Sequence, residues 1–191
     1  MAKKTPLYET HVKYGGQIVE FAGYELPVQY EGHGLIKEHT AVRTAAGLFD
    51  VSHMGELIVA GENAEAALND LLTNDIRGMY DGQVRYSLLP NEKGGAVDDV
   101  LVYRISATCF LVVVNASNAD KDAAWIAGRL PSDVTFANIS DAVAQIALQG
   151  PKSEPILRKL VKDEEVPVKY YSFRKNVIIN GMRCLISRTG Y

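Results

Sequence analysis

Apolar positions along the chain alternate with polar ones in short runs, and these runs predict many short strands with a few helices between them. The predicted helices cover 33–47, 62–74, 117–130 and 152–161, and the predicted strands cover 48–61 (one strand or two), 84–89, 96–105, 109–116, 133–139, 143–150, 176–179 and 182–187. No helix or strand is expected before Gly15 and Gly16. This order predicts an α+β fold with mostly antiparallel sheets and flanking helices.

The segments between the predicted strands carry turn residues. The loops 90–95 and 106–108 are short enough for antiparallel hairpins. Asn180 and Gly181 separate two apolar runs, and an Asn-Gly pair suits a type I′ turn, which needs positive φ at both residues. Ser117 or Asn118 is expected to cap the helix that follows.

Two aspartates, Asp98 and Asp99, stand near the start of the strand predicted over 96–105, although aspartate is a poor strand former. Side chains alternate along a strand, so the two acids point to opposite faces. If the two predicted loops fix the register, Tyr86 and Asn115 lie opposite Asp99 on the neighbouring strands. A row of phenol, carboxylate and amide would then cross three strands.

Such a row on an apolar surface is what a small-molecule pocket needs, because apolar walls take a flat ligand and a few polar groups orient it. The alternative is a satisfied, half-exposed acid at a strand end, since structural ion pairs also perturb acids. The register favours a pocket role for Asp99 and a structural role for Asp98. Both interpretations of Asp99 stay open at this point.

Composition limits the classes of function. The chain has 191 residues and a formal net charge of −3, enough for one domain or two small lobes and without the basic face of a nucleic-acid binder. No apolar run is long enough to span a membrane, and the N-terminus lacks the apolar core of a secretory signal, so we expect a cytoplasmic protein. Cys109, Cys184 and the four histidines show no metal-ligand spacing, and no metal is expected.

Several segments occur in the order seen in one known family. They are TPLYETHVKYGGQIVEFAGYELPVQY, VRTAAGLFDVSHMGE, LTNDI, YSLLPNEKGGAVDDVLVYR, ALQGP, YYSFRK and SRTGY, and together they extend over nearly the whole chain. In these segments the chain resembles the aminomethyltransferase, or T-protein, of the glycine cleavage system. LFDVSHMGE with GGAVDD and SRTGY is a specific combination.

The resemblance implies an activity and a site. The family transfers the methylene carbon of an aminomethyl group from the lipoylated H-protein to tetrahydrofolate, the co-substrate, and releases ammonia. The second acid of the Asp-Asp pair, Asp99, matches the family's central acid. The matching folate-binding positions are Met54, Tyr86, Asp99, Val113, Asn115, Tyr170 and Tyr191.

The resemblance also implies an architecture. It predicts a duplicated folate-binding α+β domain, with the family's C-terminal β-barrel absent, so we expect an N-terminal portion of a longer protein. The expected lobes are 51–137, inserted, and 1–50 with 138–191. A glutamate that the family places just past Tyr191, and an arginine further on, are not among these residues.

Two other functions share the same folate domain. One is a folate-dependent demethylase of small methylated amines. The other is a folate-binding regulatory protein without transferase activity, whose family relatives depart from the GGAVDD pattern. Because that pattern is intact over residues 94–99, the sequence favours an enzyme.

Overall fold

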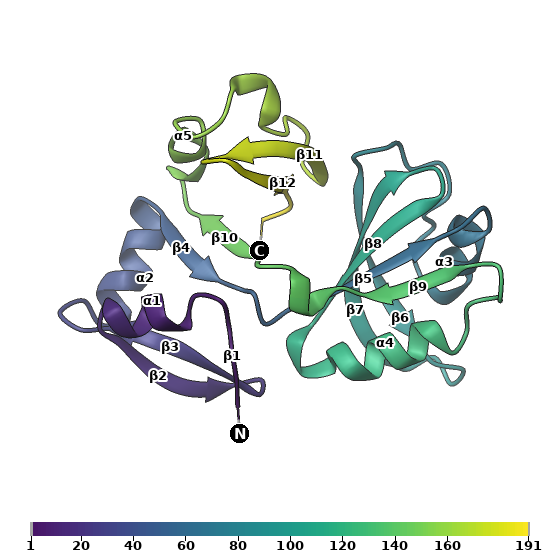
Figure 1. Cartoon of the computed structure of the whole chain (residues 1–191), viewed down its shortest axis with the longest axis horizontal. Coiled ribbons are helices and arrows are strands. Elements are labelled where there is room, and N and C mark those ends of the chain that lie inside the picture. The colour runs from purple at the N-terminus through teal and green to yellow at the C-terminus, as the bar shows by residue number, and fades with distance from the viewer. Residues whose placement is uncertain (1, 191) are drawn as a thin grey trace. The chain divides into compact units, whose positions relative to one another are not determined.

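The computed structural model describes residues 2–190, in which the chain forms two compact units (Figure 1). Unit 1 contains the residues up to His53, Val143–Leu160 and Gly190. Unit 2 contains Met54–Ala142 and Val161–Thr189. Both units mix helices with mostly antiparallel strands, so the predicted α+β class is confirmed. The predicted lobe boundaries stay a prediction, and they differ from this division mainly in the segment after Leu160, which packs with unit 2.

Unit 1 has two small sheets. Its elements are β1 (Lys3–Lys4), α1 (Tyr8–Lys13), β2 (Gly16–Phe21), β3 (Tyr24–Tyr30), α2 (Leu35–Thr44), β4 (Gly47–Asp50), β10 (Ile146–Gln149) and α5 (Ser153–Leu157). The sheets have the orders β1-β3-β2 and β10-β4, and only the β1–β3 pair is parallel in the described chain.

The expectation of no element before Gly15 is wrong, because α1 and β1 lie there. A helix of six residues is too short to show a helical repeat in the sequence, and so short a helix depends on packing for its stability. The buried His11 ties α1 to the rest of unit 1 through side-chain hydrogen bonds. Its two ring nitrogens lie 2.7 Å from the Tyr30 hydroxyl and 2.9 Å from the Asp50 carboxylate. Asp50 also accepts a hydrogen bond from Thr5 at 2.6 Å.

Unit 2 is built on a five-stranded antiparallel sheet with the order β6-β7-β8-β5-β9. The strands are β5 (Gly55–Ala60), β6 (Val84–Pro90), β7 (Ala96–Ser106), β8 (Cys109–Val114) and β9 (Thr135–Asn138). The helices are α3 (Ala64–Leu71) and α4 (Ala119–Ala127), with short 3₁₀ turns at Ala116–Asn118, Ser140–Ala142 and Asp163–Glu165. A hairpin of β11 (Ser172–Ile179) and β12 (Met182–Arg188) completes the unit.

One face of the sheet, which we call the covered face, packs against α3 and α4 (Figure 1). The main core lies there and includes Phe110, Leu57, Leu68 and Ile126, all of which are essentially inaccessible to solvent. Gly55 permits this packing, because a side chain at that position would lie 2.6 Å from Val114 and 3.0 Å from Ala119 at the start of α4.

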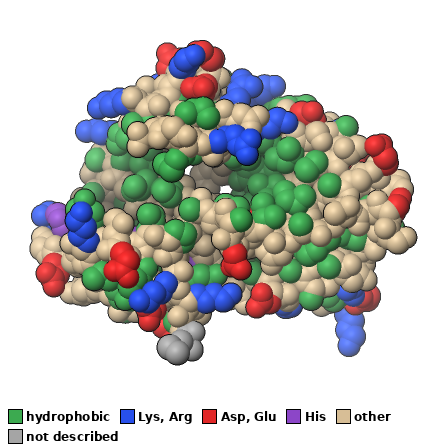
Figure 2. Space-filling model, in the orientation of Figure 1, with side chains coloured by type: hydrophobic (Ala, Val, Ile, Leu, Met, Phe, Trp, Pro, Cys, Tyr) green, Lys and Arg blue, Asp and Glu red, His purple; other side chains and the backbone are tan. Residues whose placement is uncertain are grey.

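The opposite face, which we call the open face, carries a smaller apolar cluster of Val84, Tyr103, Val113 and Phe173. The β11–β12 hairpin joins it at the start of β6, where the Val84 backbone N–H donates to Tyr171 at 2.8 Å. Figure 2 shows hydrophobic side chains gathered at the surface of this part of the chain. Among residues 2–190, none of the helices combines the length and apolar character that a membrane-spanning segment needs.

The predicted turn between β11 and β12 is confirmed. Asn180 and Gly181 have φ values of 49° and 81°, as a type I′ turn requires. The cap expected for α4 has a different outcome: Asn118 is the N-cap residue, but its side chain makes no capping hydrogen bond. The Asn118 side-chain amide donates instead to the Asp98 carboxylate.

Glu56 on β5 is an unpartnered acid in the interior of unit 2. Glu56 is 3% exposed, and neither of its carboxyl oxygens has a hydrogen-bond partner among residues 2–190. Loss of solvation disfavours the ionised form and raises the pKa of Glu56 to about 7. The strand alternation that places Leu57 and Val59 on the covered face places Glu56 on the open face.

We expect Glu56→Gln to become more stable than the wild-type protein as pH rises. In the unfolded chain Glu56 ionises near its ordinary pKa of 4.5, whereas in the folded protein it holds its proton to about pH 7. The folded state therefore binds more protons between these values, so wild-type stability falls across this window and levels off above it. The full difference is about 3 kcal/mol, and urea unfolding of both proteins from pH 4 to 9 measures it.

Glu62→Gln is the matched control, since Glu62 is exposed and lies two residues after the end of β5. Its difference from wild type should stay nearly constant with pH. A difference between Glu56→Gln and wild type that does not change with pH would show that Glu56 is not a buried neutral acid.

Candidate functional site

The candidate site lies on the open face of unit 2, where β6, β7 and β8 run side by side. The register between β7 and β8 pairs Leu101 with Val113, which continues to Asp99 opposite Asn115, as predicted. The hairpin loop is one residue shorter than predicted, and a bulge at Ile105 restores the pairing.

The predicted pairing of Tyr86 with Asp99 is wrong. Leu88 lies opposite Asp99, and Tyr86 lies opposite Leu101. The loop between β6 and β7 is one residue shorter than expected, and Val97 forms a bulge that adds one more residue to the shift. A total shift of two residues keeps every side chain on its predicted face, so Tyr86 remains a diagonal neighbour of Asp99.

Asn115 binds Asp99 directly. The Asn115 side-chain Nδ2 donates to the Asp99 carboxylate at 3.1 Å and to the Asp99 backbone carbonyl at 3.1 Å. The same nitrogen lies 3.0 Å from the carboxylate of Asp98. All three neighbours are acceptors, so the amide nitrogen, not the amide oxygen, must face them. Asn115 therefore fixes how the exposed Asp99 carboxylate is presented on the open face.

Tyr86 also interacts with Asp99. The pKa of Tyr86 is raised, first by loss of solvation and then by the charge of the Asp99 carboxylate and a hydrogen bond to it. The neutral phenol is therefore the form that this site holds. The Tyr86 side chain is 45% exposed, and Leu88 beside it is 38% exposed, so both present apolar surface to a ligand.

The remaining predicted positions lie around this pair. Val113 is buried in the apolar cluster of the open face, and Met54 packs against that cluster. Tyr170 is 63% exposed and makes an edge-to-face contact with Tyr171, at 4.7 Å between ring centroids. Tyr171 packs on the same apolar cluster. Tyr191 lies outside the described residues.

Two acids of this region were not identified from the sequence as site residues. Glu56 shares the open face with Asp99, two strands across and two residues along, which is about 12 Å by ordinary strand spacing. Asp122, on α4, approaches Asp98 on the covered face. An acid within the apolar run of residues 55–60 was a visible signal for Glu56, whereas nothing local to α4 marks Asp122.

The arrangement suits a flat ligand with N–H groups. The carboxylate of Asp99 can accept hydrogen bonds, the Tyr86 ring offers an aromatic face, and Leu88 supplies exposed apolar surface beside it. Within residues 2–190, His, Cys, Asp and Glu side chains do not gather into a group of three that could hold a metal ion.

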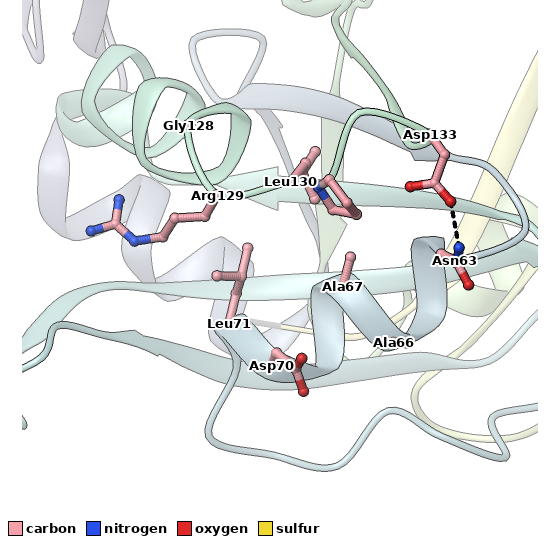
Figure 3. Close-up of a pocket in the computed structure, with 10 residues that line it drawn as sticks. Asn63, Ala66, Ala67, Asp70, Leu71, Gly128, Arg129, Leu130 and Asp133 are labelled. Atoms are coloured by element: carbon pink, nitrogen blue, oxygen red, sulfur yellow. Dashed lines mark hydrogen bonds between the residues drawn. The ribbon is translucent and has the colours of Figure 1, made fainter.

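A hollow lies elsewhere in unit 2, between α3 and the segment that follows α4. Figure 3 shows Ala67 and Leu71 on one side of it and Arg129 and Leu130 on the other. Arg129 already stacks on Trp125 and pairs with Glu92 at 2.7 Å. None of the predicted folate positions lines this hollow, so it does not belong to the candidate site.

Comparison with known proteins adds an independent finding. The family model described as the GCVT N-terminal domain matches residues 7–191. The aminomethyltransferase of Alkaliphilus oremlandii (strain OhILAs) is 50% identical over 190 residues, which are 99% of this chain and 51% of that protein. That of Geobacillus sp. (strain WCH70) is 48% identical over 191 residues, 100% of this chain and 52% of that protein. The chain thus spans about half the length of these relatives.

Two solved structures are similar in fold to this chain. The glycine cleavage system aminomethyltransferase T from Bartonella henselae matches with a TM-score of 0.84 at 34% identity, over 92% of this chain and 48% of that chain. A heterotetrameric sarcosine oxidase from Corynebacterium sp. U-96, in complex with pyrrole 2-carboxylate, matches with a TM-score of 0.59 at 20% identity, over 78% of this chain and 75% of that chain, which is a likeness of fold alone. The chain therefore belongs to the family of the GCVT N-terminal domain.

Proposed function

We propose that this chain provides the tetrahydrofolate site of an aminomethyltransferase of the glycine cleavage system. The observation that carries the proposal is the Asp99 carboxylate held by Asn115 on the open face. The chain in which it lies is 48–50% identical in sequence to two aminomethyltransferases. The donor would be the aminomethyl-lipoyl group of the H-protein. Tetrahydrofolate would be the acceptor and a substrate.

The reaction needs two new bonds at one carbon. The methylene carbon loses its bonds to the amino nitrogen, which leaves as ammonia, and to the lipoyl sulfur. It gains bonds to N5 and N10 of tetrahydrofolate. The protons of these two nitrogens leave with ammonia and with the thiol of the dihydrolipoyl arm. Alignment of the two reactants supplies much of the rate in such a transfer.

Asp99 has the right chemistry for this step. Its carboxylate is exposed on the open face and can accept a hydrogen bond from a folate N–H. As a folate nitrogen attacks, it gains positive charge, and a fixed carboxylate nearby stabilises that charge. Tyr86 and the apolar residues around it would hold the flat pterin ring. Met54, Val113, Asn115 and Tyr170 form the rest of the proposed site, with Tyr191 as a further proposed contact.

We expect Asp99→Asn to lower the rate of aminomethyl transfer about a hundredfold or more while the protein stays folded, because the amide removes the charge but keeps the shape. The measurement is ammonia release from aminomethyl-lipoyl H-protein in the presence of tetrahydrofolate. Asp70→Asn serves as the control, since Asp70 lines the hollow on the helix side of the unit. Equal losses in the two variants would remove Asp99 from the site.

Replacement of Tyr86 tests the aromatic wall. Tyr86→Ala should weaken the binding of 5-formyltetrahydrofolate, a stable reduced folate, by about tenfold, because stacking on an aromatic ring is lost. Tyr86→Phe keeps the ring and should stay within about threefold of wild type. Isothermal titration calorimetry measures both affinities. Unchanged affinity in Tyr86→Ala would place the pterin elsewhere.

A donor comparison separates the proposed transferase from a demethylase. Aminomethyl-lipoyl H-protein should support formation of 5,10-methylenetetrahydrofolate. Sarcosine and dimethylglycine should not, even with an added two-electron acceptor, which oxidation of an N-methyl group to the methylene level requires. The product is measured by its oxidation to 5,10-methenyltetrahydrofolate in a coupled dehydrogenase assay, in which NADP+ is reduced. Turnover with the methylated amines, without turnover on H-protein, would favour the demethylase. Folate binding without turnover on any donor would favour a regulatory protein.

A further inference from the structure

Two acids, Asp98 and Asp122, lie behind Asp99 on the covered face of the same sheet. Asp98 precedes Asp99 on β7 and points to the opposite side, where α4 packs. Asp122 of α4 is fully buried, and Asp98 is 8% exposed. Two buried carboxyl groups in contact are unusual, because burial and mutual repulsion both oppose ionisation of the pair.

Asp98 is the ionised member of the pair. It accepts hydrogen bonds from the side-chain amides of Asn115 and Asn118, each at 3.0 Å. Burial alone would raise the pKa of Asp98, but hydrogen bonds from Asp122, Asn115, the Asp99 backbone and Asn118 outweigh it and lower that pKa. Asn118 therefore serves Asp98 instead of capping α4.

Asp122 is the protonated member. Burial, followed by the hydrogen bond and the charge of Asp98, raises the pKa of Asp122 to about 8. The opposing charge is Lys121, whose Nζ lies 3.8 Å from Asp122 but donates at 2.5 Å to the Val97 carbonyl. Among residues 2–190 no donor group forms an ordinary hydrogen bond to either Asp122 oxygen, and Asp98 is the acceptor that a proton on Asp122 has available.

Asn115 connects the two faces of the sheet. It follows the last residue of β8, and its Nδ2 reaches Asp98 on the covered face and Asp99 on the open face. An amide has only two N–H donors to divide between these acceptors. A change in the charge or position of Asp98 must therefore change how Asn115 holds Asp99.

We propose that Asp122 is a positioning residue: it carries the proton that it shares with Asp98, and this pair sets Asn115 and, through it, the Asp99 carboxylate. The structural part of this proposal stands on unit 2 alone. Its effect on folate rests on the proposed function, since it assumes that Asp99 contacts that substrate.

The proposal has a defined dependence on pH. The titratable groups that face Asp122 are Asp98 from β7 and Lys121 from α4. Above pH 8 Asp122 loses its proton, and two carboxylates then face each other without a shared hydrogen. The Asn115 contact and the orientation of Asp99 should change in this range, in the direction of weaker folate binding.

Two substitutions at Asp122 separate the effect of its hydrogen-bond donor from the effect of its ionisation. Asp122→Asn cannot ionise and still offers a donor to Asp98, so it imitates the protonated acid. Asp122→Ala removes the donor. Asp120→Asn is the control, because Asp120 is an exposed acid in the first turn of the same helix. Urea unfolding of each variant identifies the pH range in which it is folded.

The first readout needs no ligand. In ¹⁵N-labelled wild-type protein, the Asn115 side-chain amide should be protected from exchange and its resonance should titrate near pH 8. In Asp122→Asn the protection should remain and the titration should disappear, whereas in Asp122→Ala the protection should be lost. The Asp120→Asn protein should behave as wild type. No titration of Asn115 in wild type, or protection that survives in folded Asp122→Ala, would overturn the proposal.

The second readout is the affinity for 5-formyltetrahydrofolate by calorimetry. We expect Asp122→Ala to bind about tenfold more weakly at pH 7 and Asp122→Asn to bind as wild type at pH 7 and more tightly than wild type at pH 9. If Asp122→Asn binds 5-formyltetrahydrofolate as weakly as Asp122→Ala does, the proton shared between Asp122 and Asp98 does not position Asp99. If Asn115 titrates as expected and no variant binds folate, the proposed function fails while the positioning pair stands.

Discussion

The pairing of β7 with β8 is the constraint on which the candidate site depends. It places Asn115 opposite Asp99 and so joins a flexible carboxylate to a backbone that the sheet holds in place. A shift of one residue in this pairing would turn Asp99 toward the helices and bring Asp98 to the open face. The apolar residues of both faces resist such a shift, because Val100 and Val102 would then leave the main core.

Carboxyl groups on this sheet and on α4 differ in their solvation. Asp99 is exposed, Asp98 is buried among hydrogen-bond donors, and Glu56 and Asp122 are buried without enough of them. Identical carboxyl groups therefore differ in charge at neutral pH. The site gains one fixed negative charge at the open face, backed by groups whose protonation depends on burial.

Much of unit 2 was predictable from sequence, because its strands show strong apolar alternation and its turns carry diagnostic residues such as Asn180 and Gly181. The face of Asp99 and its pairing with Asn115 followed from loop lengths. The pairing of Tyr86 did not, since a bulge at Val97 has no signature in composition. The contact of Asp122 with Asp98 was also out of reach, because it depends on how α4 packs and not on any local pattern.

The division of the chain into units has a consequence for the order of folding. Unit 2 takes Val161–Thr189 in addition to Met54–Ala142, and unit 1 takes Val143–Leu160 in between. A chain that emerges from the ribosome therefore cannot complete the open face of the sheet until the β11–β12 hairpin has been made. Until then Val84 and Tyr103 lack Phe173, their partner in the apolar cluster. Contacts between residues so distant in sequence slow folding and leave apolar surface uncovered for longer, the condition under which chaperones act on a nascent protein.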